Sequence, residues 1–141
     1  MVEIRIAFEG SLRCRSTHGP SEVQVLTDAP TDNRGLGASF SPTDLVATGL
    51  GTCMLTILGI AADERGIDVN GARARVVKRM VADPKRRIGG LDVQLEFPCE
   101  VEERDRLALE AAAHSCPVKL SLAAEVEVST TFEWGVTAGR A

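Results

Sequence analysis

The sequence lacks the marks of several classes of protein. None of its four cysteines forms a C-x-x-C pair, so a zinc knuckle is poorly supported, and we expect no metal or other cofactor. The net charge is −4 and the pI is near 5.2, with acids and bases mixed along the chain. No basic stripe is present to follow a phosphate backbone, which argues against nucleic acid as a partner.

The first residues also lack the basic region and the apolar run of a secretory signal. They read MVEIRIAFEG, which alternates in hydrophobicity and carries acids. We therefore expect a cytoplasmic protein whose thiols are kept reduced. A chain of 141 residues suits one domain with its own core, and we expect a single domain over residues 1–141.

Period-two patterns open the chain. Residues 2–9 alternate between apolar and charged side chains, which predicts a half-buried strand. Residues 11–16 and 22–27 fit two more strands around the turn signal HGPS. Residues 28–40, crowded with Asp, Pro, Asn and Gly, then read as a loop. The start is predicted to be a small antiparallel meander.

The segment after this loop, SPTDLVATGLGTCMLTILGIAADERG, predicts a long helix over residues 41–66. Ser41 can cap its start, and Pro42 suits the first helical position because its missing N–H would be unpaired there anyway. Asp44 stands three residues after Ser41, as in a capping box. Gly66 is placed to close the other end.

A stretch of this helix, from Leu45 to Ala62, carries no charge and reaches the lower limit of roughly 17 to 25 residues for a transmembrane helix. Three threonines, the glycines, and the lack of an aromatic belt or a basic flank argue against a membrane span. We expect a helix buried on most sides. A chain this short offers little to cover it, so a second copy is predicted, as a homodimer.

The second half alternates strands and helices. Strands are predicted at 69–82 and 90–97, joined by the basic connection ADPKRRIGG, and a helix with acids toward its start at 101–114. Pro117 interrupts that helix and can begin a short second one. A last alternating strand follows at 125–134. The fold class is therefore α+β.

Two of the thiols, Cys53 and Cys116, can be weighed between a packing role and a chemical one. A buried helical cysteine is most often a small hydrophobe, and Cys53 alone would be read so. Cys116 precedes Pro117 at a predicted helix start, where free N–H groups and the dipole favour a thiolate. If the helices pack, one thiol could attack a substrate and the other resolve the product. Cys14 and Cys99 have no comparable setting, and we treat both as bystanders.

The run SPTDLVATGLGTCMLTILGIA, followed later by AAAHSCPVKLSLAAEVEV, resembles the family of osmotically inducible protein C and the organic hydroperoxide resistance proteins (OsmC/Ohr). These motifs and the element order cover nearly the whole chain. The resemblance implies an OsmC-like α+β fold, with antiparallel sheets around two central helices. It also implies an intertwined homodimer with a thiol peroxidase site at the subunit interface.

The resemblance further implies a reaction in oxidative stress defence. In that family, the cysteine matching Cys53 attacks the peroxide oxygen and becomes a sulfenic acid, and the cysteine matching Cys116 condenses with it to a disulfide. A dithiol, of lipoyl type in the organic hydroperoxide branch, then reduces the enzyme. The expected substrates are organic hydroperoxides and, more slowly, hydrogen peroxide. Neither a cofactor nor a membrane is implied.

Two departures from the family pattern concern the groups that activate the thiol. The best-characterised branches carry Asn-Pro-Glu before the helix, with a glutamate ten residues ahead of the reactive cysteine that holds an arginine. That position is Thr43 here, and the nearby acid is Asp44. Arg34 is our preferred arginine because it is close in sequence to the helix start, with Arg13 and Arg15 as alternatives.

Other readings stay open at this stage. Asp44 can serve only as a capping acid, and His18 and His114 are expected to be structural or solvated. The altered acid and arginine could leave a weakly active or non-enzymatic module that binds an apolar ligand between subunits. The cysteine pair could also act as a redox sensor that peroxide oxidises without rapid turnover.

Overall fold

The computed structural model describes residues 1–137, in two compact units. The first unit is Met1–Val46 and the second is Ala47–Ala141, so the boundary falls within the long helix α1 (Pro42–Asp63). The expectation of a single domain stays a prediction.

The first unit is built on a three-stranded antiparallel sheet. Its strands are β1 (Ile4–Gly10), β2 (Arg13–His18) and β3 (Gln24–Asp28), in that order, which confirms the predicted meander. A 3₁₀ turn, η1 (Thr31–Asn33), interrupts the expected loop. The loop is also tied back to the sheet by a bridge between Thr27 and Phe40.

One face of this sheet is apolar and exposed. Alternation places Ile4, Ile6 and Phe8 on the same face of β1, with exposures of 49%, 66% and 68%. In residues 1–46, all of which the structure describes, the buried side chains are Thr27, Asp28 and Ser41, and all three are polar. The first unit therefore has a hydrophobic face without a hydrophobic core of its own.

Helix α1 begins with the predicted capping box. The Ser41 N–H donates to Asp44 Oδ2 at 2.7 Å, and the Asp44 N–H donates to Ser41 Oγ at 3.1 Å. Each residue thus satisfies a backbone donor of the other, as the Ser-x-x-Asp spacing predicts. At the far end Gly66 adopts φ 67°, and its N–H donates to the Asp63 carbonyl at 3.0 Å. Both predicted ends of the helix are confirmed.

The burial of α1 bears on our expectation of a helix covered on most sides. Within the single chain one face of the helix is buried, and the expected cover of the other sides by a second copy stays a prediction. The buried face consists of Ala47, Leu50, Gly51, Met54, Leu58 and Ala62. Thr48, Thr52 and Thr56 line an exposed stripe, and the last two hydroxyls donate to carbonyls one turn earlier, both at 2.8 Å.

By length and composition alone, α1 could cross a membrane, with a mean hydropathy of 1.9 over its most apolar 18 residues. A core helix passes the same test, and α1 packs closely on a strand. A Cβ added to Gly51 would lie 2.8 Å from Cγ2 of Val76 on β4 (Arg73–Val81). This close approach accounts for a glycine in the middle of the helix.

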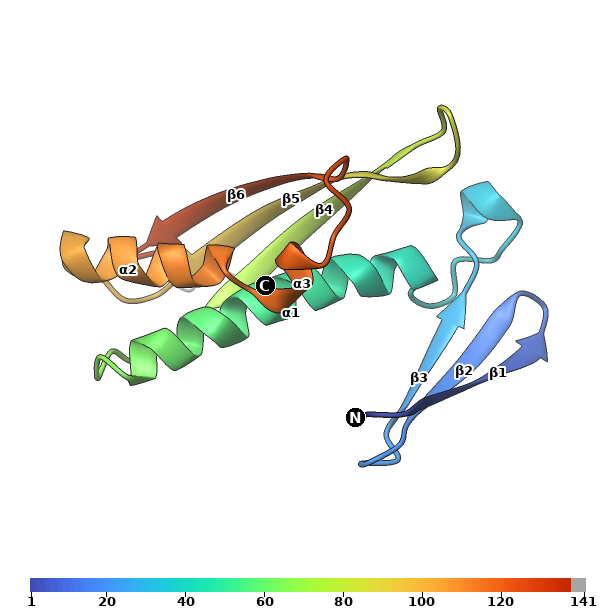
Figure 1. The fold of residues 1–141 in the computed structure, drawn as a ribbon, viewed down its shortest axis with the longest axis horizontal. Helices are drawn as coiled ribbons and strands as arrows, with labels where there is room; N and C mark the ends of the chain where they lie inside the picture. The colour runs from blue at the N-terminus through green and yellow to red at the C-terminus, as the bar shows by residue number, and fades with distance from the viewer. Residues whose placement is uncertain (138–141) are drawn as a thin grey trace. The chain divides into compact units, whose positions relative to one another are not determined.

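The second unit is a three-stranded sheet with helices on one face. Strand β5 (Arg87–Phe97) pairs antiparallel with β4 and parallel with β6 (Glu127–Trp134), so this sheet is mixed and not antiparallel throughout as expected. Figure 1 shows α1 and α2 (Glu103–His114) on the same side of this sheet. The predicted alternation of β5 is confirmed, because Leu91, Val93, Leu95 and Phe97 are all buried.

The other face of the second sheet is polar. Arg79 bonds Asp92 at 2.9 Å, and Gln94 bonds Glu133 at 2.9 Å. The strand β5 also begins earlier than predicted, at Arg87, because the charged residues of the connection continue the ladder with β4. The core of the second unit consists of Ala47, Leu50, Met54, Leu58, Ala62, Leu91, Val93, Leu95, Phe97, Leu109, Ala113 and Cys116.

Candidate functional site: a pair of thiols

Cys53 lies in the middle of α1, at the border of its buried face. Leu50 and Met54, its neighbours on the helix, are fully buried, whereas Cys53 is half-buried and packs against the core cluster. The helical period places it between the face that contacts the sheet and the exposed threonine stripe. Its sulfur is thus held by the core and still open to one side.

Cys116 lies at the corner between α2 and the single-turn helix α3 (Pro117–Leu120), and it is fully buried. It is the N-cap of α3, with an extended backbone, and Pro117 takes the first helical position as predicted. The Lys119 N–H donates to Cys116 Sγ at 3.3 Å. The sequence thus places this thiol at a helix start, with a backbone donor directed at the sulfur.

The structure brings these two thiols together. The thiol of Cys53 is a close enough neighbour of the Cys116 thiol to affect its ionisation, and neither cysteine is in a disulfide. Burial raises the pKa of the Cys116 thiol, and the neighbouring Cys53 raises it further, while the backbone N–H groups of Lys119 and Val118 act in the opposite direction. We expected the helix start to favour the thiolate of Cys116. The two N–H groups do lower the pKa of this thiol, but burial outweighs them, and the pKa is raised overall.

The candidate arginines all belong to the first unit. Arg13 Nη2 lies 3.9 Å from Oδ2 of the buried Asp28, and Arg15 pairs with Glu9. Arg34 is exposed and closes the turn η1 with a left-handed backbone, φ 70°. Since Cys53 belongs to the second unit, the choice among the three arginines stays a prediction.

Asp44 has a defined structural role, because its carboxylate caps the first turn of α1 as described above. Thr43, at the position of the family glutamate, has its hydroxyl 3.1 Å from that of Ser41. Both residues are therefore part of the helix start. That Asp44 also takes the place of the glutamate stays a prediction.

The sequence reasoning missed a contact beside Cys116. His114 Nδ1 lies 2.9 Å from Lys119 Nζ, and the imidazole ring meets Phe132 edge-on, with centroids 5.6 Å apart. The two residues stand on either side of Pro117, so no helical period brings them together, and only the corner geometry does. His18, in contrast, bonds Ser21 within its turn at 2.6 Å, as a turn histidine would.

The remaining thiols lie elsewhere. Cys14 is on β2, opposite Phe8 on one side and Thr27 on the other. Cys99 follows β5, and its carbonyl accepts from the Gly135 N–H at 3.0 Å. Over residues 1–137, no three His, Cys, Asp or Glu side chains converge as a metal site would require.

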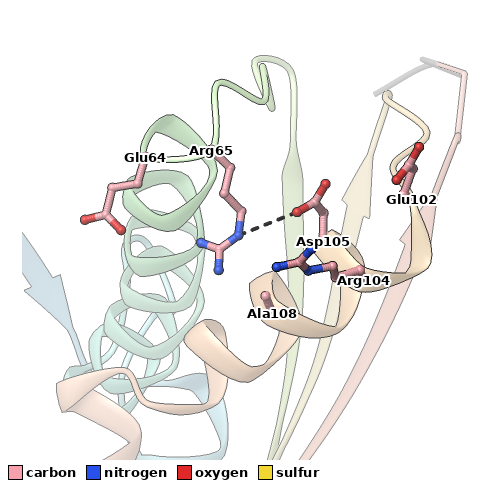
Figure 2. A pocket seen from close by; sticks show the side chains of 6 residues that line it. All are labelled: Glu64, Arg65, Glu102, Arg104, Asp105 and Ala108. Carbon is pink, nitrogen blue, oxygen red and sulfur yellow. Dashed lines mark ion pairs between the residues drawn. The ribbon is translucent and has the colours of Figure 1, made fainter.

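A charged hollow of about 440 Å³ lies between the end of α1 and the start of α2 (Figure 2). Arg65 Nε reaches toward Asp105 Oδ1 at 3.7 Å across it. Asp105 lies in the first turn of α2 and Cys116 lies just after its end. Because a helix rises roughly 1.5 Å per residue, the hollow and the thiol of Cys116 are well separated. The hollow contains no nucleophile, and its lining consists of Glu64, Arg65, Glu102, Arg104, Asp105 and Ala108.

Comparison with known proteins agrees with this geometry. A sequence model described as OsmC-like protein matches residues 35–131. A protein from Psychrobacter arcticus, proposed to be induced by osmotic stress and to act in the detoxification response, is 38% identical, with a TM-score of 0.89 and coverage of 94% of this chain and 96% of its own. No protein with a curated description matches the sequence.

Two more distant structures share the fold. The organic hydroperoxide resistance protein OsmC of Legionella pneumophila is 16% identical, with a TM-score of 0.77 and coverage of 94% of this chain and 96% of its own. The organic hydroperoxide resistance protein OhrB of Bacillus subtilis is 17% identical, with a TM-score of 0.70 and coverage of 94% and 98%. At these identities the likeness concerns the fold alone.

Proposed function

The chain belongs to the OsmC-like protein family, and on that basis we propose that it is a thiol-dependent peroxidase that reduces organic hydroperoxides in the cytoplasm. The family, with its organic hydroperoxide resistance proteins, supports a peroxide-related redox role. The observation that carries the finer proposal is that Cys53 and Cys116, from different helices, pack in the same core cluster as neighbouring free thiols. Two neighbouring thiols can become a disulfide when their backbones lie at a suitable separation.

The proposed reaction has three steps. The Cys53 thiolate attacks the terminal peroxide oxygen, so that an S–O bond forms, the O–O bond breaks, and the alcohol leaves with a proton. Cys116 then attacks the sulfur of the sulfenic acid; the S–S bond forms and water leaves. An external dithiol of lipoyl type then reduces the disulfide, is itself oxidised to a disulfide, and returns both thiols.

The two thiols suit different steps. Cys53 is open on one side, which a nucleophile needs in order to meet its substrate. Cys116 is fully buried, and burial raises the pKa of its thiol, so it stays protonated while the first step proceeds. We therefore assign the attack to Cys53 and the resolution to Cys116. The buried leucines and Met54 around them supply an apolar surround that favours alkyl hydroperoxides.

We assign Arg34 the role of holding the Cys53 thiolate ionised, and Asp44 that of orienting Arg34 in place of the family glutamate. The support is the nearness of both residues to the start of α1 in the sequence. Arg34→Ala should then slow sulfenic acid formation, while Arg13→Ala and Arg15→Ala should not. If Arg13→Ala has the larger effect, then Arg13, which pairs with Asp28, is the arginine that holds the thiolate ionised.

The homodimer is part of the same proposal. In the part of the chain that the structure describes, the apolar face of β1 and the side chains of Val46 and Ile60 on α1 are exposed, and exposed apolar surface of this kind favours a partner. A second copy would cover both and would enclose the open side of Cys53. This supports an active site completed at the subunit interface.

Turnover tests the proposal. Reduced protein is mixed with cumene hydroperoxide, free thiols are titrated, and consumption is followed with dihydrolipoamide as the reductant. We expect the loss of two thiols and continued consumption, abolished by Cys53→Ser and unaffected by Cys14→Ser. Consumption that stops at one equivalent per site would identify a sensor instead of an enzyme. Undiminished consumption by Cys53→Ser would refute the nucleophile.

A further inference from the structure

Cys116 lies at the short corner between α2 and α3. Helix α3 has four residues, Pro117–Leu120, too few to be stable as an isolated helix. Before the corner, Ser115 Oγ donates to the Ala112 carbonyl at 2.7 Å, and after it Ser121 Oγ donates to the Pro117 carbonyl at 2.8 Å. Each of these bonds lies within one helix. Neither joins α2 to α3.

The contact between His114 and Lys119 does join them. His114 is the last residue of α2 and Lys119 is the third residue of α3, and their side chains meet at 2.9 Å across the corner. A lysine ammonium can only donate, so His114 Nδ1 is the acceptor and the ring is neutral with its proton on Nε2. The same Lys119 gives its backbone N–H to Cys116 Sγ at 3.3 Å. Lys119 therefore takes part in two contacts, one with His114 through its side chain and one with the Cys116 thiol through its backbone N–H. We call the side-chain contact between His114 and Lys119 the brace.

We propose that His114 and Lys119 are positioning residues that hold the Cys116 corner in place for disulfide formation with oxidised Cys53. This inference rests on the proposed function. In the step concerned, the Cys116 thiolate attacks the sulfur of the Cys53 sulfenic acid, the S–S bond forms, the S–O bond breaks, and the oxygen leaves as water. A thiol fixed in contact with its target needs less reorganisation to react than one on a mobile turn.

The brace requires a neutral imidazole, which makes it sensitive to acid. Burial and the positive charge of Lys119 lower the pKa of His114, while Glu110 on α2 raises it. From β6 the ring meets Phe132, which carries no charge. At neutral pH the brace is intact. Once the ring is protonated, two cations face each other and the bond is lost.

The test separates the two chemical steps. One equivalent of cumene hydroperoxide is added to reduced protein; dimedone traps the sulfenic acid, and mass spectrometry after alkylation follows the disulfide. We expect His114→Ala and Lys119→Met to slow disulfide formation about three- to tenfold, the worth of one hydrogen bond, without slowing sulfenic acid formation. His18→Gln, which changes the other histidine, is the matched control and should leave both rates unchanged.

A conservative variant separates positioning from mere stability. His114→Gln retains an acceptor for Lys119 but cannot titrate, so it should form the disulfide at the wild-type rate at pH 7.5. As the pH is lowered stepwise below 6.5, the wild type should progressively fall behind His114→Gln. If the variants melt earlier but form the disulfide at the wild-type rate at every pH, the proposal is overturned.

A second oxidant keeps this result independent of the peroxidase. Oxidised glutathione converts the two thiols to the disulfide and leaves as two molecules of reduced glutathione. If peroxide fails to react but His114→Ala still slows disulfide closure from glutathione, the proposed function fails and the brace stands. Wild-type closure rates for His114→Ala and Lys119→Met with both oxidants would overturn the brace.

Discussion

The two three-stranded sheets of this chain look alike in sequence but differ in what covers them. In the second sheet the alternating residues of β5 are buried under helices, and Leu91, Leu95 and Phe97 have no exposed surface. In the first sheet the alternating residues of β1 face outward, with Phe8 68% exposed. The same pattern predicts a half-buried strand in both places, but in the single chain only β5 has a buried face, and the half-burial expected of β1 is not found.

This difference bears on where the chemistry takes place. The second unit contains both thiols, a core and a fixed corner, so the thiol pair is formed within one chain. The first unit contains the candidate arginines and an exposed apolar face. The second unit thus contains the thiol pair, and the first contains the apolar face that we propose as the dimer interface.

The largest expected effect comes from removing a ring in the covered sheet. Phe97 stacks on Trp134 with centroids 4.1 Å apart and is fully buried. Phe97→Ala should lower the free energy of unfolding by about 3–5 kcal/mol, because it leaves a cavity. The matched variant Phe8→Ala should cost much less at low protein concentration, where its face is exposed. Urea unfolding of both variants measures this, and equal losses at all concentrations would contradict the contrast.

The exposed face of the first sheet should decide the oligomeric state. Ile6→Asp places a charge on the apolar face, and Ala7→Asp places the same charge on the other face of the same strand. Burying one Ile is worth about 1.5–3 kcal/mol, so Ile6→Asp should weaken the dimer by about 10- to 100-fold. Sedimentation over a range of concentrations measures the dissociation constant. Equal weakening by Ala7→Asp would show that the apolar face is not the interface.

Much of the fold and of the candidate site could be predicted from the sequence, and part of both could not. The strands, the capping box of Ser41 and Asp44, and the corner at Cys116 depend on local rules, and the structure confirms them. The contact between His114 and Lys119 depends on how the chain turns at Pro117, and the periodicity of the sequence does not indicate this turn geometry. The uncovered side of α1 likewise depends on what packs against it, and that is a tertiary property.

The helix cap should have a smaller effect than either sheet. Ser41→Ala removes the hydroxyl that accepts from the Asp44 N–H, and such a loss typically costs about 1 kcal/mol. Thr52→Ala is the control, because it removes an exposed hydroxyl from the same helix without touching a cap. Urea unfolding compares the two. If Thr52→Ala costs as much as Ser41→Ala, the cap does not stabilise α1 as described.

The smallest expected effect is on the free energy of unfolding at alkaline pH, compared between one thiol of each unit. Burial raises the pKa of Cys116 above the ordinary value of 9.0, so in the folded protein this thiol holds its proton longer than in the unfolded chain. Below pH 9 both states are protonated and its contribution to stability is complete. As pH rises further, the unfolded chain ionises first and stability falls. Urea unfolding of the reduced protein between pH 7 and 10.5 should therefore show a shallower alkaline loss for Cys116→Ala than for the wild type. Cys14→Ala, on the open sheet, is the matched variant; if it flattens the curve as much as Cys116→Ala does, burial under the helices is not the cause.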